Sequence, residues 1–137
     1  MALIATSGWE DYALLILRIF IGVIFIAHGY HKIIHKKELS SKMGKAKAKS
    51  LIFLLGIFEI ILGVAVILGL LTQIAAIGFL IIMAGALVFN INMKKIKFIS
   101  IEDAGWDLNL ILLGVAVLLI IFGAGYLSFD FLLGIYP

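Results

Sequence analysis

The chain contains no cysteine, one proline and one arginine among its 137 residues. The lack of cysteine excludes disulfides, thiol redox centres, Cys-ligated zinc, iron–sulfur clusters and covalently attached c-type haem. Because Pro137 is the sole proline, none of the long apolar segments is kinked by one. Charged residues make up only 14% of the chain, whereas apolar residues make up 64%. A soluble domain of this size cannot bury that excess, so the composition predicts a membrane protein.

Four apolar segments are long enough to cross the hydrocarbon core, which takes about 20 residues of helix. They cover residues 12–34, 51–71, 73–91 and 106–122. Their apolar runs are continuous rather than alternating, which favours helices over the strands of a barrel. The sequence therefore predicts an all-α fold, a single membrane domain over residues 1–137 built as a four-transmembrane-helix bundle.

All ten lysines fall in the connectors that follow the first and third segments. These are Lys32, Lys36, Lys37, Lys42, Lys45, Lys47 and Lys49, and then Lys94, Lys95 and Lys97. The positive-inside rule predicts that both connectors are cytoplasmic and both termini lie outside the plasma membrane. Contact with anionic lipid headgroups is the simpler interpretation of this surface, and docking of a soluble partner is the alternative. Nucleic-acid binding is not expected, because no known motif for it is present.

Polar residues gather at one depth of the predicted bundle. At about 1.5 Å per residue, His28 and Glu59 lie about 9 and 12 Å from the cytoplasmic ends of their helices. Asp107 and Asn109 open the fourth segment at that end, and Asn90 lies near the end of the third. Ionisable groups inside a membrane helix usually face the bundle interior and mark a site or a structural pair. We therefore expect one polar cluster, with His28, Glu59 and Asp107 as its reactive groups.

A carboxylate beside an imidazole can hold a proton, accept one from a ligand hydroxyl, or hydrogen-bond a quinone carbonyl. The alternatives are a structural pair between the first two helices, or a metal site. Haem within one subunit is not expected, because His28, His31 and His35 all lie on the first helix and the other three have no histidine. We expect neither haem nor a bound metal.

Arg18 lies near the opposite, outer surface. Its nearest candidate partners are Gln73 and Asp130, and a pair between Arg18 and Asp130 would hold the carboxyl-terminal segment against the first helix. The alternative is that Arg18 binds an anionic headgroup or substrate. In the same segment, Gly123 is placed to end the fourth helix and Ser128 to cap a short one at the interface.

Glycines recur at a spacing of seven residues along the first two segments. Gly22 and Gly29 share one helix face, as do Gly56 and Gly63. Small residues allow helices to approach closely in lipid, so these faces are predicted packing seams. Glu59 lies between two of these glycines and is therefore predicted to point into the seam.

Four motifs occur in order along nearly the whole chain. They are Arg18-x-x-x-Gly22-x-x-Phe25-x-x-His28-Gly29-x-x-Lys32, Gly56-x-x-Glu59-x-x-x-Gly63 with Leu68-Gly69-Leu70-Leu71-Thr72, Met83-x-x-Ala86, and Gly105-Trp106-Asp107 with Gly123-Ala124-Gly125-Tyr126-Leu127-Ser128-Phe129-Asp130. Together they resemble the DoxX family. This sequence has Asp107 where the family usually has glutamate, and asparagine near position 90 where it often has histidine.

The resemblance implies an integral membrane protein similar to the membrane part of thiosulfate:quinone oxidoreductases, and to DoxX proteins that assemble with soluble thiol and superoxide enzymes. We therefore expect a redox-associated subunit that binds quinone through Arg18, His28, Glu59, Asn90 and Asn109. A bundle of this size has no obvious flavin site, so a partner would supply the electrons, and whether the subunit is itself an enzyme stays open. The alternatives are a non-catalytic scaffold and a small permease, with other subunits or further copies of the chain as partners.

Overall fold

A computed structural model of the chain describes residues 8–42, 48–92, 95, 97–99 and 106–135. Its helices are α1 (Glu10–Ile34), α2 (Lys36–Lys42), α3 (Ala48–Leu68), α4 (Thr72–Asn92), α5 (Trp106–Phe122) and α6 (Phe129–Leu132). No strand occurs in the described part of the chain. The predicted all-α fold is therefore confirmed.

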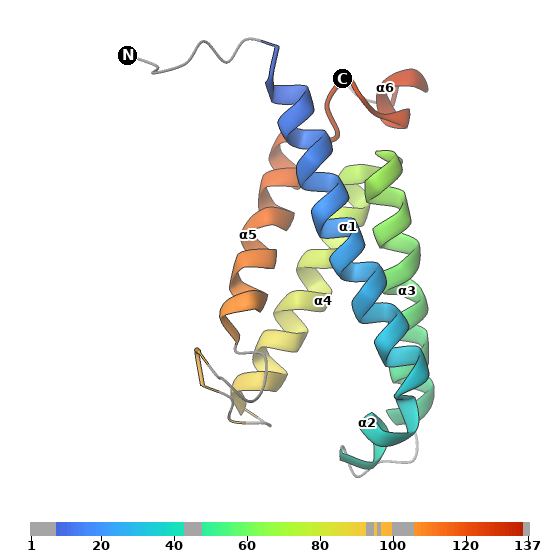
Figure 1. The fold of residues 1–137 in the computed structure, drawn as a ribbon, viewed down its shortest axis with the longest axis vertical. Helices are drawn as coiled ribbons and strands as arrows, with labels where there is room; N and C mark the ends of the chain where they lie inside the picture. Colours follow the sequence, from blue (N-terminus) through green and yellow to red (C-terminus); the bar gives the residue numbers. More distant parts are fainter. Residues whose placement is uncertain (1–7, 43–47, 93–94, 96, 100–105, 136–137) are drawn as a thin grey trace.

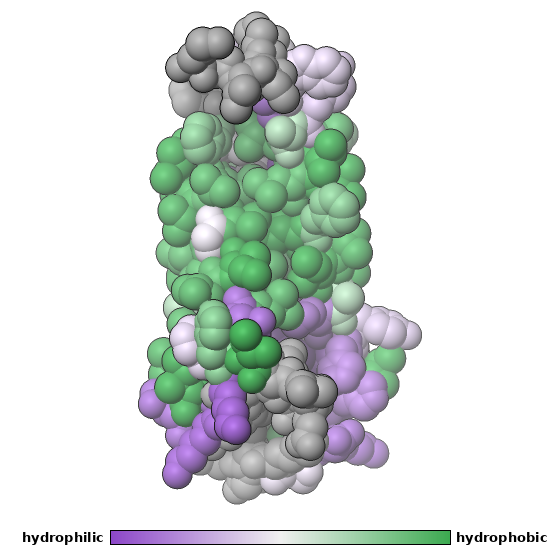
Figure 2. Space-filling model, turned by 60° about the vertical axis from the view of Figure 1, so that its left-hand side comes forward, coloured by the Kyte–Doolittle hydropathy of each residue, from purple (hydrophilic) through white to green (hydrophobic). Residues whose placement is uncertain are grey.

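Four of these helices run side by side and form the bundle (Figure 1). Among the described residues, α1, α3 and α4 are long and apolar enough to cross a membrane. α5 is shorter, with 17 residues, or about 26 Å at ~1.5 Å per residue. Figure 2 shows a belt of apolar side chains across the middle of one face of the molecule, with hydrophilic side chains gathered below it, at the end where α2 lies. The fold is that of a multi-pass helical membrane protein.

α3 begins and ends three residues earlier than the apolar segment 51–71 that the sequence marks as the second span. α3 ends at Leu68 because Gly69 has a φ of 68° and Leu71 a φ of 49°, both in the left-handed region that stops a helix. The apolar run in the sequence continues through this turn, so hydropathy alone could not locate it. α4 begins directly after the turn, at Thr72.

α1 and α3 are antiparallel and pack through the predicted glycine seams. A Cβ atom on Gly22 would lie 2.7 Å from the carbonyl oxygen of Gly63, and one on Gly56 would lie 2.8 Å from that of Gly29. Any larger side chain at these positions would push the backbones apart. The close approach confirms the packing role predicted for these glycines and fixes the register of the two helices.

The central core joins this helix pair to α4 and α5. Phe25 of α1 stacks on Phe79 of α4 with ring centroids 3.6 Å apart. Both rings are fully or almost fully buried, as are Val66 of α3 and Leu119 of α5. Aromatic stacking and burial of apolar surface thus connect all four helices near mid-depth.

The two ends of the bundle differ. α2 lies at one end, beside the last turn of α1 and the first turns of α3, so the first lysine-rich connector is partly helical as predicted (Figure 1). α6 lies at the other end, beside the start of α1. Ser128 caps α6 by accepting a hydrogen bond from the Phe131 N–H, as the sequence predicted. Lys45, Lys47 and Lys94 lie outside the described residues.

Candidate functional site

The most deeply buried acidic group in the bundle is Glu59 on α3. Its side chain has no solvent exposure, and Lys32 of α1 donates a hydrogen bond to its Oε1 atom. The second carboxylate oxygen, Oε2, has no hydrogen-bond partner among the described residues. Buried charged groups are normally paired and fully hydrogen-bonded, because an unsatisfied one is costly. Glu59 therefore keeps one strong acceptor available inside the bundle.

The glycine seam and the direction of helical side chains bring Lys32 and Glu59 together. Glu59 packs against Gly29, where an added Cβ would lie 3.1 Å from the Glu59 Cβ. Side chains on a helix lean toward its amino terminus, so Lys32 extends back along α1 from the lysine-rich end toward the middle of the bundle. Its side chain remains 23% exposed. The ion pair thus connects the bundle interior with the surface at that end.

The expected pair between His28 and Glu59 is not formed. His28 is exposed, and no hydrogen bond or ion pair joins it to the carboxylate among the described residues. His28 lies near the level of Glu59, since its neighbour Gly29 packs against Glu59, but His28 itself lies about 100° around the helix from the buried seam. Lys32, which we assigned to the connector, takes the place of the imidazole.

The other expected members of the inner cluster lie between α4 and α5. Asn90 Nδ2 donates to Asn109 Oδ1 at 3.2 Å, and Asn109 Nδ2 contacts the Met83 sulfur at 3.7 Å. Asp107 stands in the first turn of α5, where a carboxylate complements the helix dipole. No hydrogen bond joins Asp107 to Glu59 among the described residues. The single predicted cluster is therefore divided between the two helix pairs.

A second polar cluster lies around Arg18, at the end of the bundle opposite α2, which is called the outer end after the predicted orientation. The guanidinium is completely buried and donates a hydrogen bond from Nη2 to the Leu127 carbonyl oxygen. It occupies the space beside Gly69 that a Cβ atom would fill. Its Nε and Nη1 atoms have no hydrogen-bond partner in the described part of the chain. Arg18 thus holds the carboxyl-terminal segment against α1, as the sequence predicted.

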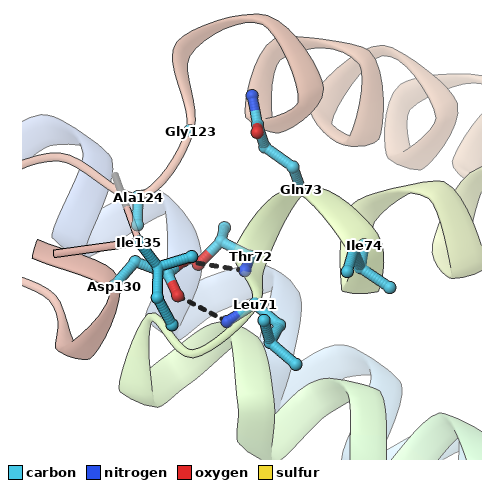
Figure 3. Close-up of a pocket in the computed structure, with 8 residues that line it drawn as sticks. All are labelled: Leu71, Thr72, Gln73, Ile74, Gly123, Ala124, Asp130 and Ile135. Atoms are coloured by element: carbon cyan, nitrogen blue, oxygen red, sulfur yellow. Dashed lines mark hydrogen bonds between the residues drawn. The ribbon is translucent and has the colours of Figure 1, made fainter. Parts of the chain in front are cut away.

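The partner of Arg18 is nevertheless not the one predicted. Asp130 accepts hydrogen bonds from the Leu71 N–H at 2.6 Å and the Thr72 N–H at 2.9 Å (Figure 3). These backbone groups belong to the α3–α4 turn and the start of α4, where a helix has unsatisfied donors. Asp130 therefore caps α4, and the described residues contain no ion pair between it and Arg18. Instead of the expected ion pair between Arg18 and Asp130, the structure has Asp130 capping α4 from a segment distant in sequence.

A small cavity adjoins this cap. It has a volume of about 110 Å³ and is lined by Leu71, Thr72, Gln73, Ile74, Gly123, Ala124, Asp130 and Ile135 (Figure 3). The Thr72 hydroxyl is buried and has no hydrogen-bond partner among the described residues. At about 10–15 Å³ for each water, the cavity has room for several waters, for which Thr72, Gln73 and Asp130 are the polar groups in a mainly apolar lining. We assign it a structural role.

Taken together, the apolar belt, the helix lengths and the buried polar groups define a multi-pass α-helical membrane protein. The sequence model of the DoxX family matches residues 13–91, which include α1, α2, α3 and nearly all of α4. The chain belongs to the DoxX family. This confirms the resemblance that the sequence motifs indicated.

A curated relative is an uncharacterized membrane protein of Mycobacterium tuberculosis, which is 35% identical over 78 residues. The match covers 54% of this chain and 48% of the relative, so the chain spans about half the length of the protein it matches. No solved structure matches the chain.

Proposed function

We propose that this DoxX protein is an integral membrane subunit of a redox-associated complex, and that it binds quinone or a similar small lipophilic ligand beside Lys32 and Glu59. The observation that carries the proposal is the buried Glu59 carboxylate with Oε2 left unpartnered among the described residues. An acceptor of this strength inside an apolar bundle is suited to a ligand that brings its own donor.

The two side chains offer complementary chemistry. The Lys32 ammonium is a donor for a carbonyl oxygen, and Glu59 Oε2 is an acceptor for a hydroxyl hydrogen. A quinone carries the first group and its reduced form the second, so the ligand would supply electron transfer coupled to proton transfer. Because Lys32 is 23% exposed and Glu59 is fully buried, the pair could also pass protons between the ligand and the surface.

The remaining predicted site residues lie away from the Lys32–Glu59 pair. Asn90 and Asn109 join α4 to α5, Asp107 lies in the first turn of α5, and Arg18 lies at the outer end. None of them bonds to Glu59. Electrons would come from a partner protein that docks at the lysine-rich connectors.

A scaffold without a ligand is the second candidate, and one observation favours it. Lys32 and Glu59 bridge α1 and α3 beside the Gly29–Gly56 contact, where an ion pair would also stabilise helix association. In that case the protein would anchor partners in the membrane, and the buried pair would only maintain the fold.

A ligand titration distinguishes these candidates. Purified protein in detergent is titrated with a short-chain ubiquinone analogue, and the thermal unfolding midpoint is followed together with equilibrium binding. Binding at Glu59 should saturate at one site and raise the midpoint in proportion to the logarithm of ligand concentration. A weak, non-saturating response equal to that of a simple lipid-soluble dye would favour the scaffold.

We also propose that the protein lies in the plasma membrane with its lysine connectors in the cytoplasm. The start of α1 and α6 lie at one end of the bundle and α2 at the other, which is consistent with this orientation (Figure 1). A reporter fused after Pro137 that is active only outside the cytoplasm should therefore give full signal. Signal only from a cytoplasm-specific reporter at the same position would reverse the orientation.

A further inference from the structure

An open groove lies at the lysine-rich end, between α2 and the first turns of α3. It has a volume of about 420 Å³ and is lined by Lys36, Lys49, Ser50, Phe53 and Leu54. None of these residues belongs to the Lys32–Glu59 pair or to the outer cluster. The lining is cationic and hydroxyl-bearing at Lys36, Lys49 and Ser50, and aromatic and aliphatic one turn further along α3, at Phe53 and Leu54.

Lys36 is held over this groove. Its ammonium nitrogen lies 4.5 Å from the centroid of the Phe53 ring, a cation–π contact between α2 and α3. The contact already restricts the Lys36 side chain in the free protein. Less conformational entropy is therefore lost when Lys36 binds an anion. Lys49 and Ser50 are exposed on the neighbouring turn of α3. The groove thus presents two ammonium groups and a hydroxyl on adjoining helices.

The apolar wall is continuous with the membrane-facing side of α3. Leu54 is 52% exposed, and its neighbours on the same helix face, Leu51 and Phe58, are 54% and 57% exposed. These exposed apolar residues lie on α3, a helix apolar enough to cross the membrane, whereas α2 lies at the end of the bundle where hydrophilic residues gather (Figure 2). The groove therefore crosses the boundary between the acyl-chain region and the headgroup region.

We propose that this groove binds an anionic phospholipid. Its phosphate would lie between Lys36 and Lys49 and accept a hydrogen bond from the Ser50 hydroxyl, while an acyl chain would follow Phe53 and Leu54 toward the bilayer. The charge and the apolar wall select this occupant together. Free phosphate has no group to cover the apolar wall, and a zwitterionic headgroup brings a cation that two lysines repel.

The test uses the purified full chain, delipidated in neutral detergent and titrated with phosphatidylglycerol, with phosphatidylcholine, and with inorganic phosphate. Native mass spectrometry counts the bound lipid. Wild type should bind one phosphatidylglycerol molecule in preference to phosphatidylcholine. The double variant Lys36→Gln/Lys49→Gln should lose about thirtyfold in phosphatidylglycerol affinity, since each lysine near an anionic lipid contributes roughly fivefold.

The matched control is Lys37→Gln/Lys97→Gln, which removes the same charge from exposed positions outside the groove. It should keep the affinity within about twofold, because unspecific surface charge contributes little. The charge-preserving variant Lys36→Arg/Lys49→Arg should retain binding. Equal losses in the groove and control variants, equal binding of both lipids, or competition by millimolar phosphate would each overturn the proposal.

Discussion

Glu59→Gln is expected to weaken quinone binding strongly while the protein stays folded. Glutamine has nearly the same shape as glutamate, so the α1–α3 seam around Gly29 can remain closed. The substitution removes the charged acceptor, and hydrogen bonds to charged groups contribute about 1.5–3 kcal/mol. The affinity should therefore fall by roughly 10- to 150-fold. The measurement is the ligand titration described above, run beside thermal unfolding in the same detergent.

The fold should tolerate this change because Lys32 is partly exposed and can extend toward the headgroups once its partner is neutral. The reverse variant, Lys32→Met, leaves the buried Glu59 without its cation and should destabilise the protein by about 3–5 kcal/mol. Thr72→Val is a suitable control, since it removes a buried hydroxyl at the outer end and should leave ligand affinity unchanged. If Glu59→Gln bound quinone normally but unfolded much earlier, the pair would be structural and the scaffold candidate would be correct.

Asp130→Asn is expected to destabilise the protein by about 2–3 kcal/mol without changing quinone affinity. The carboxylate accepts two backbone hydrogen bonds at the start of α4, and an amide group can accept only one and presents a donor to the other. The variant also removes the negative charge that complements the amino-terminal end of the α4 dipole. Denaturant or thermal unfolding in detergent measures the loss.

Asp11 supplies a matched control at the same end of the bundle. It also accepts a backbone hydrogen bond, from the Tyr126 N–H at 2.7 Å, but this bond is exposed to solvent. Asp11→Asn should therefore cost less than about 1 kcal/mol. Arg18→Met combined with Asp130→Asn should cost less than the sum of the single variants, because both hold the same carboxyl-terminal segment. Equal losses for the two aspartates, or strict additivity, would contradict the capping role.

Features governed by hydrophobicity and local spacing could be predicted from the sequence. The helices, the glycine seams and the Ser128 cap follow from apolar length, the spacing of small residues and local capping chemistry. The burial of Glu59 was also predictable, because it lies between Gly56 and Gly63 on one helix face.

The pairing of the buried charges could not be predicted in the same way. Depth along the membrane placed His28 level with Glu59, but the rotation of α1 exposes His28 and turns Gly29 toward α3. Lys32 was overlooked because it lies at the end of the apolar run, and only the length and direction of its side chain bring it to Glu59. The available signal was its position three residues after Gly29, which places Lys32 beside the glycine seam.

The capping of α4 by Asp130 has a consequence for biogenesis. The Leu71 and Thr72 amides and the carboxylate that satisfies them are separated by 59 and 58 residues along the chain. The α3–α4 turn is therefore synthesised before the segment that caps it, and it stays uncapped until that segment has been made. Water or lipid headgroups at the outer surface must solvate the exposed turn in that interval. Final closure of the bundle then depends on the segment around Asp130, so truncation just before Asp130 should yield inserted helices that remain open to quality-control proteases.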